Sequence, residues 1–261
     1  MKDKQTIDFN ITYKPKIVLW KFILQILIVT LIIVGIETLD YFVIAKYFGQ
    51  WESKIGTNEP YVLNLQTWID KIMPWFTSIY AYYIAWPFIW FIIIPAFIYL
   101  SSGKHGYYQY VINSLMMYIA GMIIYALIPT TCTPANFIGK NGWDASINKP
   151  FHNELEKLAN DNNNIYGSCP SYHNYWAALF IFFGFKKGVK AHWRSIMLTL
   201  GTLISVSTLL LHQHNVIDVI VTYAMTYCFI VIEKKYDFAN RFEKLLNKIF
   251  KVEFPIVNKN K

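Results

Sequence analysis

The chain has 261 residues, of which 55% are hydrophobic and only 15% are charged, against about 25% charged residues in soluble domains. Its apolar residues lie in long runs that are almost free of charge and lack a polar face, which argues against a soluble helical bundle. The net charge of +8 is compatible with binding to nucleic acid, but the distribution of the charge indicates a membrane instead.

Six apolar runs predict six membrane-spanning helices, because most of them approach the roughly 20 residues that cross a bilayer core. They cover residues 17–38, 76–100, 107–129, 173–185, 195–211 and 215–232. The predicted fold class is therefore all-α, a polytopic membrane protein. The first run is too long for a signal-peptide core and no cleavage site follows it, so we expect it to remain as a helix.

Residues 39–75, between the first and second runs, mix charged and apolar side chains. This pattern predicts a re-entrant or interfacial segment before the second span, with its tryptophans at the level of the lipid headgroups. We expect one integral membrane domain over residues 1–261 with its core at 76–232. The basic segment 233–261 is expected to be a cytoplasmic tail, either as an amphipathic helix on an anionic inner leaflet or as a solvated segment.

Basic residues are distributed unevenly between the two sides of the predicted membrane protein. If both termini are cytoplasmic, the inner segments hold 18 of the 24 lysines and arginines. This excess on one side is the positive-inside pattern. The sequence therefore predicts a multi-pass protein of the cell membrane, with cytoplasmic termini and the loop 130–172 on the extracytoplasmic face.

Two polar clusters meet at this outer face. Pro170-Ser171-Tyr172-His173 begins the fourth run, and His214 with Asp218 lies where the fifth run turns into the sixth. Residues four apart share a helix face, so Asp218 can accept a hydrogen bond from one nitrogen of His214. That bond would leave the other nitrogen as a base or nucleophile.

The pattern Pro-Ser-x-His, followed by Ser-x6-His-x3-Asp from Ser207 to Asp218, resembles two signature motifs of the type-2 phosphatidic acid phosphatase superfamily. The resemblance implies a six-helix membrane enzyme that acts on lipid phosphates. It covers most of the chain from the second span onward in topology, although about a dozen positions hold the motifs.

The resemblance also implies roles for individual residues. His214 corresponds to the nucleophile that forms a phosphohistidine, Asp218 to its orienting partner, and His173 to the acid and base. Ser171 and Ser207 correspond to residues that bind the substrate phosphate, aided by the amides at the start of the fourth helix. No metal, cofactor, nucleic acid or obligate protein partner is implied beyond the lipid phosphate substrate and the bilayer.

The chain departs from the family pattern at its phosphate clamp. The family's Lys-x6-Arg-Pro motif is absent, and Thr208 follows Ser207 where most members have an arginine. Neutral donors are expected to take part, with Thr208 and loop residues as candidates. The loop candidates are Thr131, Thr133 and Asn136 as neutral donors, and Lys140, Lys149 and His152 as charged groups.

The motif from Ser207 to Asp218 is closer to the branch that contains inositol phosphorylceramide synthases, which move a phospho-headgroup between lipids. A clamp with little charge suits a phosphodiester better than a monoester. Hydrolysis and transfer both remain open. A catalytically degenerate lipid-binding protein of the same fold is the alternative, and a membrane cytochrome with histidine haem ligands is a third reading. A disulfide between Cys132 and Cys169 is also left open.

Overall fold

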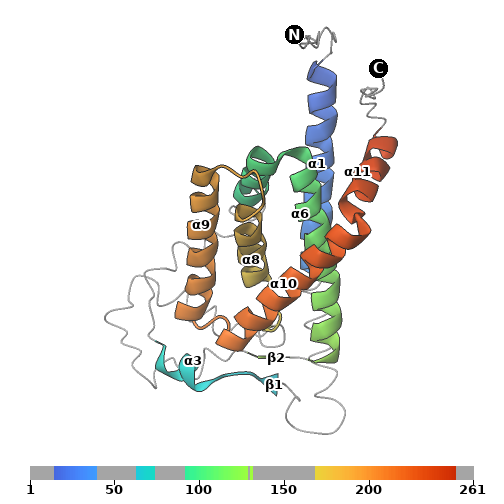
Figure 1. Ribbon diagram of the computed structural model, residues 1–261. Helices are drawn as coiled ribbons and strands as arrows, with labels where there is room; N and C mark the ends of the chain where they lie inside the picture. The colour runs from blue at the N-terminus through green and yellow to red at the C-terminus, as the bar shows by residue number, and fades with distance from the viewer. Residues whose placement is uncertain (1–14, 40–62, 74–91, 129, 132–167, 251–261) are drawn as a thin grey trace, which may run out of the picture.

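The computed structural model describes residues 15–39, 63–73, 92–128, 130–131 and 168–250. Within these ranges seven helices form a bundle, and a pair of two-residue strands lies at one end of it (Figure 1). This confirms the all-α prediction. The elements in chain order are α1 (Pro15–Leu39), β1 (Leu63–Asn64), α3 (Trp68–Ile72), α6 (Ile94–Leu127), β2 (Thr130–Thr131), α8 (Tyr172–Gly184), α9 (Ala191–Leu210), α10 (Val216–Tyr236) and α11 (Phe238–Ile249).

Three of the described helices, α6, α9 and α10, are long and apolar enough to cross a membrane, which indicates a membrane protein. Helix α8 has 13 residues, about 20 Å at 1.5 Å per residue, less than the roughly 30 Å of a hydrocarbon core. The arrangement of six spans stays a prediction. Residues 76–91 and most of the predicted interfacial segment lie outside the described residues.

Helix α6 combines parts of two predicted spans. Gly103 leaves the helical conformation inside it, with φ 70° and ψ −170°. Glycine reaches this positive φ without steric cost because it has no Cβ. The break falls between the predicted runs 76–100 and 107–129, where two separate spans would require a turn.

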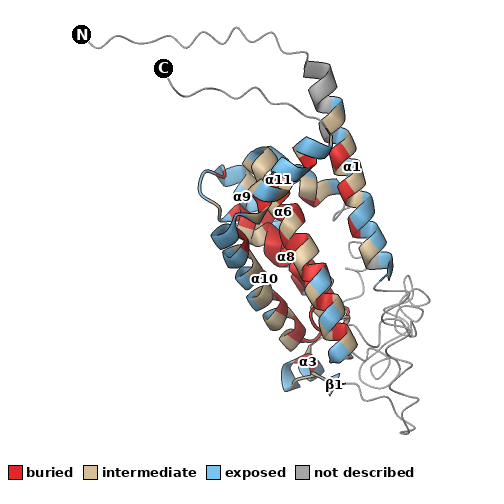
Figure 2. Cartoon of the chain, turned by 90° about the vertical axis from the view of Figure 1, so that its right-hand side faces the viewer, coloured by how far each residue is buried: buried red, intermediate tan, exposed pale blue. Residues whose placement is uncertain are grey.

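Helix α8 lies at the centre of the bundle and packs against α6, α9 and α10. Its residues from Asn174 to Phe180 are all buried (Figure 2). A helix that is apolar on nearly all sides is stable only when it is enclosed. Burial, rather than contact with lipid, therefore explains why this run is apolar although it is short.

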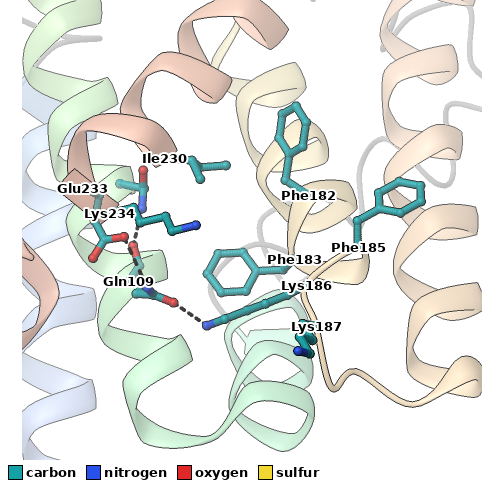
Figure 3. Close-up of a pocket in the computed structure, with 10 residues that line it drawn as sticks. Gln109, Phe182, Phe183, Phe185, Lys186, Lys187, Ile230, Glu233 and Lys234 are labelled. Carbon is teal, nitrogen blue, oxygen red and sulfur yellow. Dashed lines mark hydrogen bonds between the residues drawn. The ribbon is translucent and has the colours of Figure 1, made fainter.

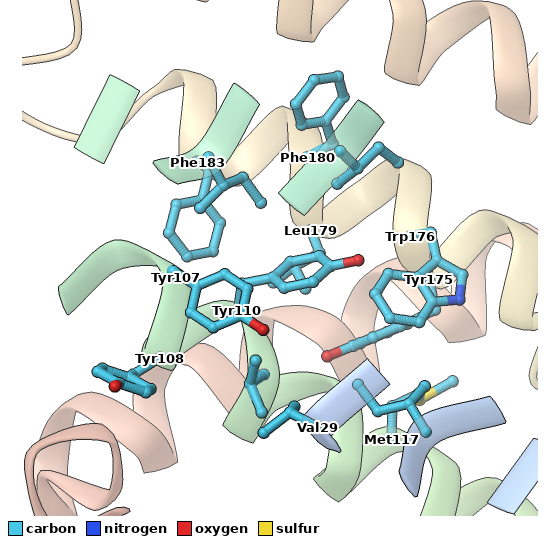
Figure 4. Packing of buried hydrophobic residues seen from close by; sticks show 14 of the residues in the cluster. Val29, Tyr107, Tyr108, Tyr110, Met117, Tyr175, Trp176, Leu179, Phe180 and Phe183 are labelled. Atoms are coloured by element: carbon cyan, nitrogen blue, oxygen red, sulfur yellow. The ribbon is translucent and has the colours of Figure 1, made fainter. Parts of the chain in front are cut away.

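Aromatic side chains fill the space between α8 and α6 (Figure 4). The rings of Tyr110 and Trp176 have centroids 5.1 Å apart, and those of Tyr118 and Tyr172 lie 4.6 Å apart. A Cβ at Gly121 would lie 2.6 Å from the ring of Tyr172, so only glycine leaves room for that ring. This packing fixes the start of α8 against α6.

A short turn joins α8 to α9, and the two helices pack closely. A Cβ at Gly201 would come within 2.9 Å of the carbonyl oxygen of Ala177. At the end of α8, the Arg194 Nε donates to the carbonyl oxygen of Gly184 at 3.1 Å. This bond satisfies one of the carbonyl groups that a helix end leaves without a partner in the helix.

The strands β1 and β2 pair in parallel, with Leu63 opposite Thr130 and Asn64 opposite Thr131. They lie with α3 at the end of the bundle where α8 and α10 begin (Figure 1). The pairing joins a part of the predicted interfacial segment to the start of the outer loop.

The predicted basic tail contains α11, which packs against α6. Lys104 of α6 lies 3.3 Å from the Glu243 carboxylate, and Leu246 is buried in the core cluster. Leu245 and Ile249 are exposed on the same helix. This segment therefore contains an amphipathic helix with part of its apolar surface against the bundle. Its contact with an inner leaflet stays a prediction.

Candidate active site

The two motif segments meet at the end of the bundle that holds β1, β2 and α3. Ser171 is the N-cap of α8, and its side chain accepts a hydrogen bond from the Asn174 amide at 3.1 Å. This preference of serine for the N-cap places His173 in the first helical turn. His214 lies in the five-residue connection between α9 and α10, just before Asn215, the N-cap of α10.

His173 and His214 are in direct contact. The Nε2 atom of His214 lies 3.4 Å from the Nδ1 atom of His173, and the ring centroids are 5.5 Å apart. His214 is buried, whereas His173 is half-buried. The structure thus brings together two residues that are 41 positions apart in the chain.

The other ring nitrogen of His214 has a backbone partner. Its Nδ1 lies 2.9 Å from the carbonyl oxygen of Ser168. A carbonyl oxygen only accepts hydrogen bonds, so Nδ1 must hold the proton in this contact. In the neutral ring this leaves the lone pair on Nε2, the atom that faces His173.

Asp218 is fully buried and lies near His214, but it does not make the hydrogen bond that the four-residue spacing predicts. Its Oδ2 atom is 3.7 Å from His214 Nδ1, beyond the usual range for a hydrogen bond. Oδ2 instead accepts from the Asn215 amide at 2.8 Å and from the hydroxyl of Ser168. Asp218 therefore holds both segments that position His214, while the Ser168 carbonyl orients the ring.

The predicted phosphate-binding hydroxyl groups of Ser171 and Thr208 are joined by one amide. Asn174 Nδ2 lies 2.9 Å from Ser171 Oγ and 2.9 Å from Thr208 Oγ1. Thr208 Oγ1 also donates to the Ser205 carbonyl oxygen at 2.9 Å. The Thr208 hydroxyl therefore links α8 to α9, which is a structural use that its sequence position did not indicate.

Of the other predicted phosphate-binding residues, the structure describes Ser207 and Thr131. Ser207 is buried, and its hydroxyl donates to the carbonyl oxygen of Ile204 at 2.7 Å. Thr131 belongs to β2, at the same end of the bundle. Thr133 and Lys140 lie outside the described residues, as do Asn136, Lys149 and His152.

A second set of buried groups holds the segment before α8. The amide of Cys169 donates to Thr130 Oγ1 at 2.7 Å, and the amide of Ser168 donates to the Thr130 carbonyl oxygen at 3.1 Å. Thr222 of α10 accepts from the Ser171 amide at 2.8 Å. The sequence analysis missed Ser168, Thr130 and Thr222 because hydroxyl residues in loops and helices are common and these belong to no predicted motif.

Asp70 of α3 is a further residue that the sequence analysis missed. Its Oδ1 accepts from the Val216 amide, the first residue of α10, at 2.8 Å. Its Oδ2 accepts from the amide and the hydroxyl of Thr67, at 2.7 Å and 2.6 Å. Asp70 is buried, so it ties α3 to the helix that begins directly after His214. No sequence signal connects two positions 146 residues apart.

Two titratable groups flank the histidine pair without belonging to it. His212 has φ 49°, and burial lowers its pKa, while the Met73 backbone and the Asp70 carboxylate act in the opposite direction. Cys169 is a buried free thiol. Burial and then the Asp218 carboxylate raise the pKa of Cys169 to about 12, so the unreactive thiol form is favoured. Cys132 lies outside the described residues.

The two arginines of the chain lie away from this site. Arg194 is in the first turn of α9 and bonds the end of α8, and Arg241 is in α11. The start of α9 and helix α11 lie at the other end of the bundle (Figure 1). In the described part of the chain, no group of three or more His, Cys, Asp or Glu residues is placed to hold a metal ion.

The chain was compared with curated proteins, solved structures and sequence models of protein families. No curated protein and no solved structure is significantly similar to the chain. The sequence model of the PAP2 superfamily matches residues 49–232, about 70% of the chain, and this range includes Ser171, His173, His214 and Asp218. Together with two motif segments that fold onto one site, this match shows that the chain belongs to the PAP2 superfamily.

Proposed function

We propose that the protein cleaves or transfers the phosphate ester of a membrane lipid through a phosphohistidine on His214. Membership of the PAP2 superfamily indicates phosphatase-type activity on lipid phosphates and an enzyme in general. The observation that supports the finer proposal is the orientation of His214, with Nδ1 held by the Ser168 carbonyl and Nε2 directed at His173.

In this mechanism the lone pair on His214 Nε2 attacks phosphorus, and the bond from phosphorus to the leaving oxygen breaks. Protonated His173 supplies a proton to that oxygen. Neutral His173 then takes a proton from an acceptor hydroxyl, whose oxygen attacks the phosphohistidine and releases His214. Water as the acceptor gives hydrolysis, and a lipid alcohol gives transfer.

The substrate must enter between the two rings. A reacting phosphorus lies about 3–3.5 Å from its nucleophile before the bond forms, whereas the two ring nitrogens themselves are 3.4 Å apart. His173 is on the enclosed helix α8, and His214 is in the connection between α9 and α10. We therefore infer that a movement of this connection admits the phosphoryl group.

The charge near the site favours a substrate of low negative charge. Besides hydroxyls and amides, the described groups around the histidines include the His212 ring, the Cys169 thiol and the carboxylates of Asp218 and Asp70, and neither arginine is nearby. A phosphodiester has one negative charge and needs less compensation than a monoester. This supports transfer of a phospho-headgroup, as in the inositol phosphorylceramide synthase-like branch, over hydrolysis of a phosphomonoester.

The direct test is an assay of the detergent-purified protein with a panel of lipids. Phosphatidic acid, an isoprenyl pyrophosphate, phosphatidylglycerol and phosphatidylinositol would be supplied with and without a lipid alcohol acceptor. We expect turnover of at least one lipid, preserved in EDTA, and a protein-bound phosphate that is labile in acid and stable in alkali. His214→Ala should lose both, whereas His192→Ala should keep both, because His192 is exposed at the other end of the bundle.

Other outcomes would contradict this assignment. Turnover that is lost in EDTA and restored by magnesium or zinc would contradict the metal-independent mechanism. Binding of a phospholipid with no turnover of any member of the panel would favour the catalytically degenerate lipid-binding alternative.

We further propose that the site faces the extracytoplasmic side. The turn between α8 and α9, at the opposite end of the bundle, contains Lys186, Lys187 and Lys190, as the positive-inside rule expects for a cytoplasmic turn. A cysteine at the exposed Lys71 should react with a membrane-impermeant maleimide in intact cells, above the signal of the parent protein. A cysteine at the exposed Lys187 should react only after lysis, and the reverse pattern would invert the topology.

A further inference from the structure

A cavity of about 400 Å³ lies between α6, α8 and α10, at the end of the bundle away from the histidine pair (Figure 3). Phe183, one of its lining residues, follows His173 by ten positions in α8, about 15 Å along the helix. The cavity is therefore separate from the proposed active site, and its use does not depend on the proposed reaction.

One wall of the cavity is a hydrogen-bonded chain of three polar side chains, which come from α6, α10 and the turn after α8. The Lys186 ammonium donates to Gln109 Oε1, and Gln109 Nε2 donates to Glu233 Oε2 at 3.2 Å. Glu233 is only 2% exposed. This chain links α6, the end of α8 and α10, and it sets the polar groups of the wall in defined positions.

Asn113 supplies a buried acceptor in the same wall. Its Nδ2 donates to the Gln109 carbonyl oxygen at 2.7 Å, but its Oδ1 has no hydrogen-bond partner among the described residues. The side chain is 1% exposed and lines the cavity. A buried acceptor without a donor is costly, so a ligand that donates a hydrogen bond here would be stabilised.

The charged and apolar residues that line the cavity indicate what else a ligand must contain. Lys187 and Lys234 also line the cavity, and together with Lys186 they exceed the single charge of Glu233 by two. Phe182 and Ile230 provide apolar surface next to these charges (Figure 3). This combination matches a group with a phosphate, a hydroxyl and an attached hydrocarbon chain.

We propose that this cavity binds the headgroup of an anionic glycerophospholipid from the leaflet at the basic end of the bundle. Lys187 and Lys234 bind the phosphate ester, a headgroup hydroxyl donates to Asn113 Oδ1, and an acyl chain lies along Phe182 and Ile230. The lipid joins the ends of α8 and α10, the two helices that position His173 and Asp218 at their other ends. It is a stabilising lipid, not the substrate.

The test uses the full chain in a neutral detergent, with native mass spectrometry and thermal unfolding as the two measurements. Phosphatidylglycerol should bind and raise the melting temperature, whereas phosphatidylcholine should do so much less. Soluble glycerol 3-phosphate should have little effect, because it lacks the acyl chain. An equal effect of glycerol 3-phosphate would overturn the lipid assignment, and so would equal effects of the two lipids.

The double variant Lys187→Gln/Lys234→Gln should weaken phosphatidylglycerol binding by about tenfold or more, because charge-assisted hydrogen bonds are lost. Its matched control is Lys244→Gln/Lys248→Gln, which removes two exposed charges from α11. Equal losses in both variants would show that general surface charge, rather than the cavity, attracts the lipid.

Asn113→Leu separates a ligand site from a purely structural network. The change removes the unsatisfied acceptor with little change in volume, so we expect unchanged or higher stability without lipid and a smaller gain from phosphatidylglycerol. An undiminished gain would contradict the role of Asn113. Asn113→Ser retains a neutral acceptor and a donor, so it serves as a second variant, for which we expect more of the lipid effect to remain than in Asn113→Leu.

Discussion

His214 takes its orientation from the backbone of Ser168, whose carbonyl oxygen lies 2.9 Å from Nδ1 of the imidazole ring. The acidic partner that the motif suggests, Asp218, is farther away at 3.7 Å. Asp218 instead binds the two segments that contain Ser168 and His214. Its Oδ2 accepts from the Ser168 hydroxyl and from the amide of Asn215, the residue after His214, at 2.8 Å. The orientation of His214, the proposed nucleophile, thus depends on a buried carboxylate that holds two chain segments together.

The first prediction concerns the histidine pair. His214→Ala and His173→Ala should each lower kcat by at least about a thousandfold, and the double variant should be scarcely worse than either, because groups that act in one step are not additive. Single-turnover kinetics with the best lipid of the panel measures this. Full activity in His214→Ala together with loss in His212→Ala would show that the nucleophile is assigned to the wrong histidine.

The second prediction separates Asp218 from Ser168. Ser168→Ala removes the hydroxyl but keeps the carbonyl oxygen that His214 contacts, so we expect a loss in kcat of less than about tenfold. Asp218→Ala removes the acceptor of the Asn215 amide, which costs about 0.5–2 kcal/mol at a helix N-terminus, and misplaces His214. We expect a loss of about a hundredfold or more in kcat, since small displacements of reacting groups have effects of this size.

The comparison of Asp218→Ala with Asp218→Asn provides the control. Asn keeps one oxygen that can accept from the Asn215 amide, so thermal unfolding should show Asp218→Asn to be the more stable of the two. If Ser168→Ala proved as inactive as Asp218→Ala, the hydroxyl of Ser168, rather than its carbonyl group, would be the important group.

The third prediction concerns Asp70 as a positioning residue. Asp70→Ala removes the acceptor of the Val216 amide and releases α3 from the start of α10. We expect kcat to fall by about tenfold or more with a smaller change in KM, because Asp70 acts on the position of His214 and not on substrate binding.

Two variants test whether this effect belongs to the contact. Asp70→Asn keeps an acceptor oxygen and should retain more activity than Asp70→Ala, and Lys71→Ala changes the exposed neighbour on the same helix and should have no effect. If Asp70→Ala raised KM while kcat stayed constant, α3 would contact the substrate and the positioning role would be excluded.

The fourth prediction is a pH dependence of stability at His212. Burial lowers the pKa of His212 in the folded protein, although Asp70 and the Met73 backbone oppose this effect. The unfolded chain therefore binds a proton at His212 at a higher pH than the folded chain does. The contribution of neutral His212 to stability is complete above the unfolded pKa of about 6.5 and is lost as the pH falls through the lower folded pKa.

His212→Asn measures this contribution, because asparagine tolerates the positive φ of this position and does not titrate. Between pH 7.5 and 5.5 the melting temperature of the parent should fall by a few degrees more than that of the variant, since about 1 kcal/mol corresponds to about 2–4 °C for a chain of this size. Parallel melting curves over this range would exclude His212 as the titrating group.

The sequence by itself determined that the protein is all-α with membrane-spanning helices, and it identified His173, His214 and Asp218 as residues of the candidate site. Apolar runs such as 195–211 and 215–232 correspond to α9 and α10, because length and hydropathy are local properties of the chain. The pairing of His173 with His214 was also predictable, since two consecutive antiparallel runs return the second motif to the level of the first. The break at Gly103 lies in residues 101–106, between the predicted runs 76–100 and 107–129.

Tertiary structure alone decided the partners of those residues. The spacing of His214 and Asp218 predicted a direct hydrogen bond, but Asn215, the N-cap of α10, lies between them. Asp218 therefore accepts from the Asn215 amide, and the Ser168 carbonyl takes its place beside the ring. The contact from Asp70 to Val216 joins positions whose separation along the chain has no sequence signature. Hydrogen bonds to backbone groups depend on distance and direction after folding, and the identity of a residue does not specify where another segment will place its amide or carbonyl.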